Sequence, residues 1–343
     1  MIEDLRIREN IEGREGSLSP HAVRSKNSLG RKLNEESDPI RTAFQRDRDR
    51  IIHSKAFRRL KHKTQVFIAP RGDHYVTRLT HTLEVSQIAR TLSRSLNLNE
   101  DLTEAIAMGH DLGHTPFGHI GEEVLNELYH GGFRHNEQSL RVVDVLENEG
   151  KGLNLSMEVR DGILNHSKST EKILDGWVKM ETYEGEICRI ADSIAYINHD
   201  IDDAIRAGII KGEELPESAS VILGNSRRKR INAMVLDIIE QSWVVSGKIA
   251  GEPVISMSEP VRQATNTLRY FLFTRVYNPN DDREESQKAR QTVRFLYSYF
   301  RENGDTLPSE YLVYSDEPDQ RVVDYISGMT DQYATNLAEE LRK

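Results

Sequence analysis

The most informative segment of the chain reads Gly109-His110-Asp111-Leu112-Gly113-His114-Thr115-Pro116-Phe117-Gly118-His119-Ile120-Gly121-Glu122. It follows a short apolar stretch and continues into a Gly/Pro turn, so the His110-Asp111 pair stands at the end of a predicted helix. An adjacent imidazole and carboxylate can direct two ligands at one cation, and such donors suit Mn, Fe, Zn, Ni or Mg. The dipeptide alone is weak evidence for a metal site, because the same dipeptide occurs again at His199-Asp200. The further histidines that follow His110-Asp111 closely indicate that this dipeptide belongs to a metal site.

Helical periodicity extends outward from this segment in both directions. Asp101 and Glu104 have the spacing of an N-cap and an acid in the first turn, and open a helix that ends near Gly109. One apolar stripe consists of Leu79, Leu83, Ile88, Leu92 and Leu96. Further helical patterns cover residues 135–149, 182–207, 227–242, 259–276, 285–302 and 320–342.

Alternating strand patterns are scarce in this chain. Residues 66–68 form a candidate short strand, and 209–224 and 244–258 have room for minor strands. The glycines form neither a G-x-G-x-x-G motif nor a Walker A motif, which excludes Rossmann and P-loop nucleotide sites. We therefore predict an all-α fold with at most minor short strands.

The charge of the chain is unevenly distributed. The 343 residues carry a net charge of -9, yet residues 41–80 hold eleven basic and three acidic groups. A basic stretch in an acidic protein suits a local phosphate-rich partner. The alternative is pairing within one helix, because Arg46, Arg48 and Arg50 alternate with aspartates. Charge alone leaves both interpretations open.

The single cysteine, Cys188, excludes an intrachain disulfide framework and a cysteine-based zinc site. We expect it to be a small buried hydrophobic residue of a protein in the reducing cytoplasm. No apolar run is long enough for a transmembrane helix, and the first residues lack the apolar region of a secretory signal.

Several motifs together resemble a known family. The order Thr77-Arg78-Leu79-Thr80-His81, His110-Asp111 and Arg189-Ile190-Ala191-Asp192 resembles the H…HD…D signature of the HD superfamily of metal-dependent phosphohydrolases. More narrowly, the chain resembles the deoxynucleoside triphosphate triphosphohydrolases, the dGTPase-like branch, from about residue 40 to its end. The narrower resemblance rests on residues 57–67, 114–119, 135–139 and 328–334.

The resemblance implies an architecture and a metal site. It implies an HD phosphohydrolase core over residues 38–208, with a C-terminal helical region over 209–343 packed on that core. Composition predicts the other two parts: residues 1–37 are polar and irregular and form a flexible N-terminal arm, and 209–226 is the candidate linker. The implied metal ligands are His81, His110, Asp111 and Asp192. Two neutral imidazoles and two carboxylates balance a divalent ion and leave positions open for water and phosphate. The ion, whether Mn, Mg, Fe, Ni or Zn, is not specified.

The reaction implied by the resemblance is an attack of water on the α-phosphorus, with the whole triphosphate leaving. His119 and Glu122 stand at i and i+3, so they share a helix face if a helix begins after Phe117. The resemblance makes them a catalytic pair, and an imidazole backed by a carboxylate suits general acid–base work. Whether His119 acts as acid or base stays open. His114 has an assisting role, since some relatives carry Asn at its position.

The resemblance also assigns substrate contacts. Arg78 and His135 are implied to bind phosphate, and Gln65, Tyr196 and Asp200 the deoxyribose. Asp192, Tyr196 and Asp200 follow an i, i+4, i+8 pattern, which places a metal ligand and two polar groups on one stripe of a helix. A tyrosine beside C2′ would explain a preference for deoxyribose over ribose.

The implied partners are a deoxynucleoside triphosphate, dGTP included, and further copies of the chain in a tetramer or hexamer. A nucleotide activator between subunits and single-stranded DNA are two further partners that the arginines at 46, 48 and 50 would suit. Two other functions stay open: another HD phosphohydrolase, such as a 5′-nucleotidase or a phosphodiesterase of cyclic nucleotides or guanosine polyphosphates, and a nucleotide- or DNA-binding regulator.

Overall fold

The computed structural model describes residues 5–68, 74–167, 173–174, 179–278 and 283–343. Within these ranges the protein is all-α, as predicted, and its described part contains no strand beyond two isolated bridges, Arg31–Ser156 and Thr64–Thr77. The α-helices are α1 (Ile7–Arg14), α2 (Ala43–His53), α3 (Lys55–Arg59), α4 (Arg78–Ser95), α5 (Glu100–Gly109), α6 (His119–Leu128), α7 (His135–Arg141), α8 (Glu147–Gly150), α9 (Met157–Asn165), α10 (Tyr183–Arg206), α11 (Glu217–Leu223), α12 (Arg227–Gln241), α13 (Glu259–Leu272), α15 (Glu284–Glu302), α16 (Pro318–Ser327) and α17 (Asp331–Leu341).

Side-chain caps set where the central helices begin. Thr77 forms a capping box at the start of α4, and Thr182 accepts the backbone N–H of Gly185 at the start of α10. The expected N-cap at Asp101 is wrong, because Asn99 accepts the backbone N–H groups of Asp101 and Leu102. An asparagine oxygen two residues earlier therefore begins α5 at Glu100.

Three of the predicted helical patterns are not single α-helices in the structure. The pattern at 135–149 continues from α7 into a π-helical segment, Val142–Leu146, and that at 259–276 continues from α13 into another, Phe273–Tyr277. The pattern at 320–342 divides into α16 and α17, because the Thr330 side chain caps a new helix. The expected strands are wrong as well: residues 66–68 form bends, and the segment after 209 contains α11.

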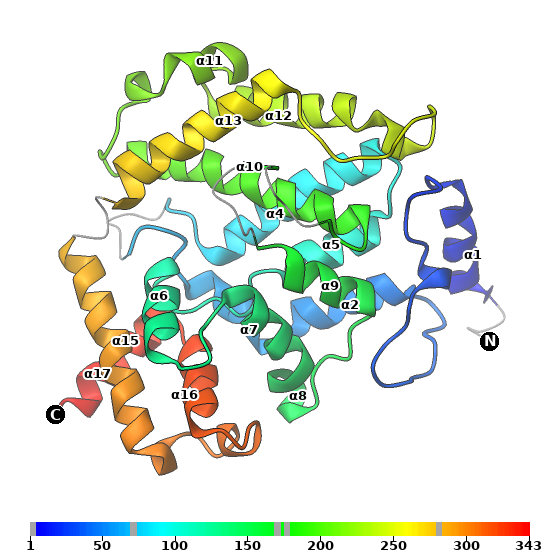
Figure 1. Ribbon diagram of the computed structural model, residues 1–343. Helices are drawn as coiled ribbons and strands as arrows, with labels where there is room; N and C mark the ends of the chain where they lie inside the picture. Colours follow the sequence, from blue (N-terminus) through cyan, green and yellow to red (C-terminus); the bar gives the residue numbers. More distant parts are fainter. Residues whose placement is uncertain (1–4, 69–73, 168–172, 175–178, 279–282) are drawn as a thin grey trace.

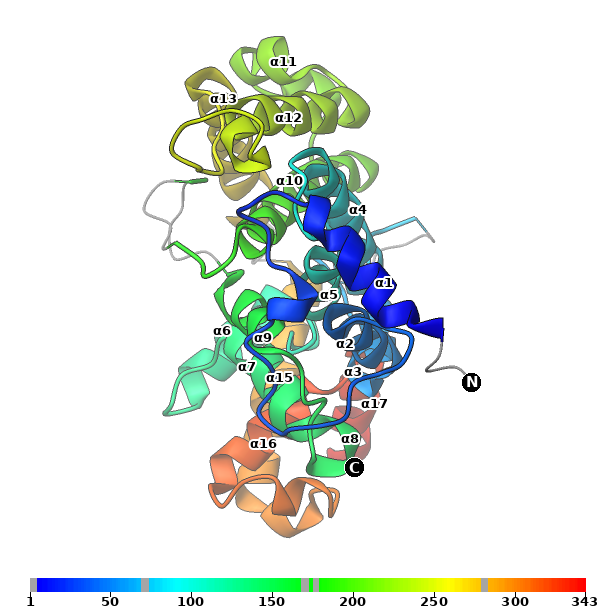
Figure 2. The same cartoon turned by 90° about the vertical axis from the view of Figure 1, so that its right-hand side faces the viewer.

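The helices form a central bundle with a group of helices at each end (Figure 1). Helix α10 packs on α4, α4 on α5, and α5 on α2 and α9, around a core that includes Leu92, Ile106 and Ile194. Figure 2 shows α11, α12 and α13 at one end of the bundle and α15 and α16 at the other. A second core joins α6 to α15 and α16 through residues such as Val124 and Val293. The C-terminal helices thus support α6, on which His119 and Glu122 lie.

The N-terminal segment, expected as a flexible arm, makes specific contacts from residue 5 onward. Ser25 donates to the buried Glu15, and Ser19 donates to the backbone of Val245. Arg31 forms a buried ion pair with Asp47 of α2. These contacts place the segment along the bundle beside α2 and α5 (Figure 2). The boundary at residue 37 stays a prediction.

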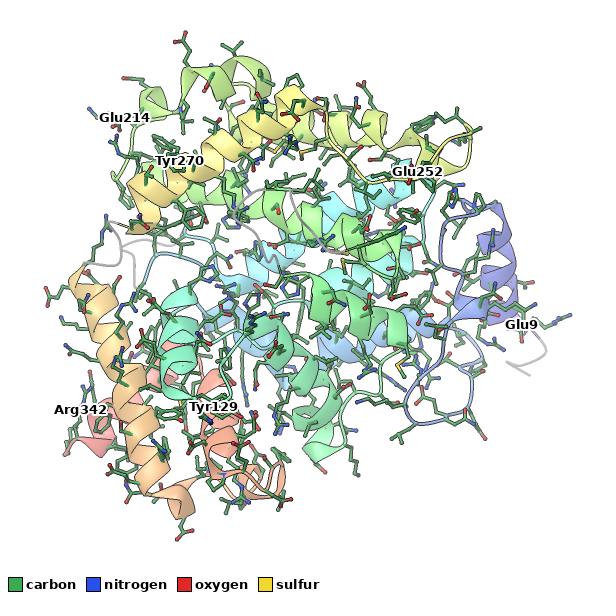
Figure 3. The ribbon with its side chains drawn as sticks, viewed as in Figure 1. Glu9, Tyr129, Glu214, Glu252, Tyr270 and Arg342 are labelled. Carbon is green, nitrogen blue, oxygen red and sulfur yellow. The ribbon has the colours of Figure 1, made fainter. Side chains whose placement is uncertain are left out.

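The arginines of the basic stretch are engaged within the chain. Arg46 and Arg50 both pair with Glu35, at 3.3 and 2.8 Å, and Arg48 pairs with Glu104 at 3.1 Å. Glu35 and Glu104 lie outside α2, so these arginines pair mainly with other segments of the chain, and only the Arg48–Asp49 contact at 3.1 Å matches the expected pairing within one helix. None of the described helices is both long enough and apolar enough to span a membrane. Charged residues such as Glu9 and Arg342 lie at the periphery (Figure 3).

A buried carboxylate joins the C-terminal helices to the bundle. Asp324 of α16 is fully buried and accepts hydrogen bonds from Arg141 at 2.6 and 2.7 Å and from Gln138 at 3.1 Å. Both partners lie on α7, which also begins with His135. Arg141 and Gln138 therefore hold α16 against α7, a helix of the candidate site.

We expect Asp324→Ala to lower the free energy of unfolding by about 3 kcal/mol, because it leaves the Arg141 guanidinium partly buried without its carboxylate. Urea unfolding followed by circular dichroism measures the change. Asp305→Ala, at an exposed position, is the control and should leave the unfolding midpoint nearly unchanged. Equal midpoints for the two variants would contradict this role of Asp324.

Candidate active site

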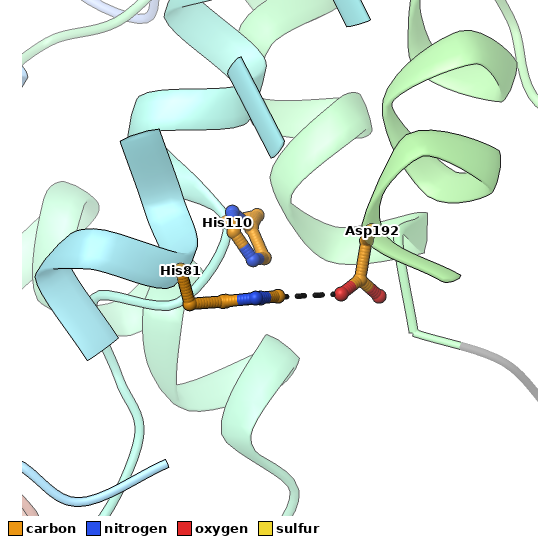
Figure 4. A group of neighbouring side chains, drawn as sticks. All are labelled: His81, His110 and Asp192. Atoms are coloured by element: carbon orange, nitrogen blue, oxygen red, sulfur yellow. Dashed lines mark ion pairs between the residues drawn. The ribbon is translucent and has the colours of Figure 1, made fainter. Parts of the chain in front are cut away.

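Four side chains from three parts of the bundle lie close together; three of them are buried, and Asp192 is partly exposed. His81 lies in the second turn of α4, Asp192 in the middle of α10, and His110 directly after the last residue of α5, followed by Asp111. Figure 4 shows His81, His110 and Asp192 pointing toward one another. The structure brings together all four residues that the H…HD…D resemblance implied as metal ligands.

The ring nitrogens and carboxylate oxygens of this cluster lie close together. His81 Nε2 lies 3.2 Å from Asp192 Oδ1 and 3.9 Å from Asp111 Oδ2, and His110 Nε2 lies 3.6 Å from Asp111 Oδ1. Ligand atoms of His81, His110 and Asp192 all lie within 4.8 Å of one another. Burial lowers the pKa of His81 despite the neighbouring carboxylates, so its ring is neutral at pH 7.

The protonation of these rings shows that the cluster fits a cation. His110 Nδ1 lies 2.7 Å from the carbonyl oxygen of Ala107, so the ring proton is on Nδ1 and Nε2 carries a lone pair. That Nε2 is buried and has no hydrogen-bond partner among the described residues. A lone pair beside two carboxylates is costly unless a positive ion lies between them. Imidazole and carboxylate donors suit Mn, Fe, Ni or Zn, with Mg as a harder alternative.

A histidine that the sequence analysis set aside supports His81. His199 Nε2 lies 2.9 Å from His81 Nδ1, and its own Nδ1 is 2.8 Å from Asp200 Oδ1. The contact between His199 Nδ1 and Asp200 Oδ1 is electrostatic and is not a hydrogen bond, because Nδ1 of His199 makes no hydrogen bond within the described structure. The carboxylate favours a proton on that Nδ1, so we assign His81 Nδ1 as donor to His199 and His81 Nε2 as the free ligand atom. The i+7 spacing from Asp192 placed His199 on the same face of α10.

Arg78, expected to contact the α-phosphate, lies against Asp111, one of the implied metal ligands. Its Nη1 donates to Asp111 Oδ2 at 2.8 Å, and it also donates to the carbonyl oxygens of Thr64 and Gln65. Burial would raise the pKa of Asp111, but the adjacent ring of His110 and the guanidinium of Arg78 hold it well below its usual value. Arg78 thus keeps the carboxylate ionised and fixes the loop that carries Gln65.

A second cluster surrounds Glu122, three residues into α6. His119 Nδ1 lies 3.5 Å from Glu122 Oε2, as the i, i+3 spacing predicted, but the shorter contact is from His135 Nδ1 to Glu122 Oε1 at 2.8 Å. Burial would raise the pKa of Glu122, whereas His135 and His119 hold it well below its usual range. The ring of His114 stacks on that of His135, 4.6 Å between centroids. The side chain of His119 is 73% exposed, so it alone of this cluster is open to solvent.

Both clusters open into one pocket of about 400 Å³. Its far wall carries Tyr196 and Asp200, both implied as sugar contacts, and Tyr277, whose hydroxyl donates to Asp200 Oδ2. Arg269, buried beside Tyr196, and His166 also line the pocket, and the sequence analysis missed both. The lining also contains the predicted residues Gln65, Arg78, His81, Asp111, His114, His119, His135 and Asp192, so His110 and Glu122 are the two predicted site residues outside it.

A C-terminal carboxylate positions the loops around the pocket. Asp331, the first residue of α17, accepts the backbone N–H of Thr64 at 3.0 Å and that of Phe117 at 2.9 Å. Phe117 has a positive φ of 61° and Gly118 one of 60°, where a Cβ would come within 2.8 Å of the Gln65 carbonyl. The strained turn that precedes His119 is therefore fixed by a residue of the C-terminal region.

Comparisons with known proteins place the chain among HD-domain proteins. The HD domain family matches residues 78–197, and the phosphohydrolase-associated domain matches residues 255–340. A deoxyguanosinetriphosphate triphosphohydrolase-like protein of Caldanaerobacter subterraneus subsp. tengcongensis is 57% identical, covering 98% of this chain and 96% of the relative. Proteins of the same name from Desulfatibacillum aliphaticivorans and Clostridium perfringens are 49% and 50% identical, over 98% and 97% of this chain and 97% and 96% of their own. A solved structure of a hypothetical protein from Aquifex aeolicus covers 85% of this chain and 67% of its own at a TM-score of 0.46 and 18% identity.

We expect His199→Ala to weaken binding of a divalent cation about 10- to 100-fold, because His81 loses the acceptor that fixes its ring. Isothermal titration of the chelator-treated protein with Mn²⁺ measures the change. His199→Gln, which keeps an acceptor, should lose less affinity, and the exposed His130→Ala should lose none. Equal affinity of the wild-type protein and His199→Ala would show that His199 does not position the ligand.

Proposed function

Because the chain belongs to the deoxyguanosinetriphosphate triphosphohydrolase-like family of HD-domain proteins, we propose that it hydrolyses deoxynucleoside triphosphates, dGTP included, to a deoxynucleoside and inorganic triphosphate. The observation that carries this proposal is the meeting of two clusters in one pocket. His81, His110 and Asp192 form a group that fits a cation, Asp111 lies beside it, and the Glu122 cluster supplies an exposed imidazole in the same pocket. A polar wall suited to a sugar completes the pocket.

The proposed reaction breaks the bond between the 5′ oxygen and the α-phosphorus. Water supplies the oxygen that replaces it on phosphorus; one proton leaves the water and one reaches the 5′ oxygen. A divalent cation bound by the four ligands would supply positive charge at the phosphate and acidify water. Arg78 holds Asp111 ionised and oriented as one of those ligands.

The Glu122 cluster is suited to move the proton. His119 reaches the pocket from the first turn of α6 and is accessible to substrate, while Glu122 stays ionised behind it. Burial would lower the pKa of His135, but the charge and hydrogen bond of Glu122 raise it, which favours a cationic ring that binds phosphate. Burial and the nearby Arg78 lower the pKa of His114 well below its usual value, so His114 is neutral and assists as a hydrogen-bonding group.

The far wall supports recognition of the deoxyribose. Gln65 Oε1 is buried and makes no hydrogen bond in the described structure, and it faces the pocket that Tyr196 and Asp200 also line. A buried acceptor in this state is available to a hydroxyl of a ligand. Tyr196 is half-buried beside the metal cluster, where its ring would exclude a 2′-hydroxyl.

The alternative functions would use fewer of the residues in this pocket. A 5′-nucleotidase or another HD phosphodiesterase would use the four metal ligands without the His114, His119 and His135 set. A regulator of nucleotide or DNA binding would have no use for an intact cation cluster beside an acid–base pair. Assembly into a tetramer or hexamer, a nucleotide activator and single-stranded DNA binding stay predictions from the family resemblance.

We expect incubation with dGTP and Mn²⁺ to yield deoxyguanosine and inorganic triphosphate in equal amounts, identified by chromatography of both products. Orthophosphate or pyrophosphate as the product would favour one of the other HD hydrolases. Asp111→Asn should reduce turnover at least about 100-fold, because the amide removes a charged ligand and the partner of Arg78. Asp305→Asn is the matched exposed control and should keep full turnover.

We expect the wild-type protein to prefer dGTP over GTP in kcat/KM by at least about tenfold, because the ring of Tyr196 occupies the space of a 2′-hydroxyl. Tyr196→Ala should reduce this preference, mainly by improving hydrolysis of GTP relative to dGTP. Comparable kcat/KM values of the wild-type protein for the two nucleotides would exclude the steric role, while leaving the hydrolysis itself established by its products.

A further inference from the structure

Three buried carboxylates hold the backbone of the segment that comprises residues 15–30. They belong to Glu15 in the segment itself, Glu158 in the first turn of α9 and Glu184 in the first turn of α10, and these residues are 8%, 4% and 0% exposed. Each accepts one backbone N–H of the segment, in the same order from Ser25 at 2.6 Å, Leu29 at 2.6 Å and Val23 at 3.0 Å. The proposed hydrolysis uses none of the three.

Asn99, the N-cap of α5, connects two of these carboxylates. Its backbone N–H donates to Glu184 Oε1 at 3.0 Å, and its Nδ2 donates to Glu15 Oε1 at 3.2 Å. The same Nδ2 donates to the carbonyl oxygen of Val23 at 2.8 Å, while the N–H of Val23 donates to Glu184 Oε1. Both backbone groups of Val23 are therefore bound, and the segment is attached to the starts of α5, α9 and α10 at once.

None of the hydrogen-bond partners of these carboxylates is basic within the described residues. Besides backbone N–H groups, the partners are the side chains of Ser25, Ser28 and Asn99. Arg24 donates instead to the backbone carbonyl oxygen of Glu15. The ring of His21 packs edge-on against Tyr183. The titratable groups that surround Glu184 and Glu15 on the neighbouring helices are acidic or thiol groups: Asp101 of α5, Glu158 of α9 and Cys188 of α10.

A buried carboxyl group without a basic partner is more stable neutral than ionised. Burial therefore raises the pKa of Glu184 from its usual 4.5 to about 7, and it also raises the pKa of Glu15. The neutral group keeps the oxygen that accepts from Val23 and Asn99. Ionisation places charge near Glu158, and Oε2 of Glu184 is buried without a hydrogen bond in the described structure. Proton loss from Glu184 therefore destabilises the docked segment.

We propose that residues 15–30 form a pH-dependent contact, which is held closed on the starts of α5, α9 and α10 by protonated Glu184 and is weakened when Glu184 ionises. In the open state Glu184 has access to water and titrates at its usual pKa. The stabilisation of the closed state is therefore complete below about pH 4.5 and is lost as the pH rises to about 7. Between these limits closing takes up one proton, so its equilibrium constant falls about tenfold per pH unit. This contact is independent of the proposed hydrolysis.

Hydrogen exchange of the full-length protein at pH 5, 6, 7 and 8, followed by mass spectrometry, measures the contact. After correction for the intrinsic exchange rate at each pH, the protection of peptides from residues 15–30 should fall about 100-fold between pH 5 and 7 and level off above pH 7. Peptides of α15, at the other end of the bundle, report global unfolding and should not show this fall.

Two variants separate the role of Glu184 from a general effect of pH. Glu184→Gln keeps an oxygen that accepts from Val23 and Asn99 but cannot ionise, so its protection should be the same from pH 5 to 8. Glu158→Gln removes the neighbouring charge, so the fall should be smaller and should end below pH 7. The exposed Glu339→Gln is the matched control and should keep the wild-type fall.

Three results would overturn the proposal: constant protection of the segment in the wild-type protein, an unchanged fall in Glu184→Gln, or an equal fall in α15. Circular dichroism shows whether each variant is folded. If Glu184→Gln does not fold, Glu158→Gln decides, because a fall identical to that of the wild-type protein would contradict the role of Glu184.

Discussion

Ring nitrogens and carboxylate oxygens that face one another in the middle of the bundle are the constraint on which this structure depends. His81, His110, Asp111 and Asp192 present lone pairs and negative charge to a common point with very little exposure to water. Such a cluster is unfavourable by itself and becomes favourable around a cation. The hydrogen bonds that fix these rings from behind, to a carbonyl oxygen for His110 and to His199 for His81, direct Nε2 of each ring toward the carboxylates.

The ends of helices deliver most of the chemistry. The residues after α5 and α9 turn their rings back onto the last carbonyl groups of the helix, which satisfies those groups and fixes the ring nitrogens. The start of α6 brings Glu122 within reach of His119, and the start of α7 brings His135 to the same carboxylate. A helix end is rigid on one side and open on the other, so a side chain there can face a pocket while its backbone stays in the bundle.

The sequence predicted residues that share a segment or a motif better than residues that meet across the fold. Helical periodicity indicated α4, α5 and α10 to within a residue or two, and the H…HD…D order identified a cluster that the structure assembles. Periodicity could not show the π-helical segment Phe273–Tyr277, because its apolar residues continue the pattern of α13. His166 and Arg269 reach the pocket only through packing of α9 and α13 on the bundle. His199 was within reach of prediction, because it stands two turns from Asp192 on the same helix face.

The C-terminal region acts on the site through backbone groups. Lys63 is fully buried and donates to the carbonyl oxygens of His114 and Ser327, so one side chain joins the histidine-rich turn to α16. Burial and the neighbouring Arg59 lower the pKa of Lys63 to about 7, which shows how little water reaches this contact. Asp331 fixes the other side of the same turn through Phe117. A turn with positive φ at two successive residues is stable only when its surroundings hold it from both sides. The phosphohydrolase-associated segment, 255–340, therefore determines where His119 stands without contributing the imidazole itself.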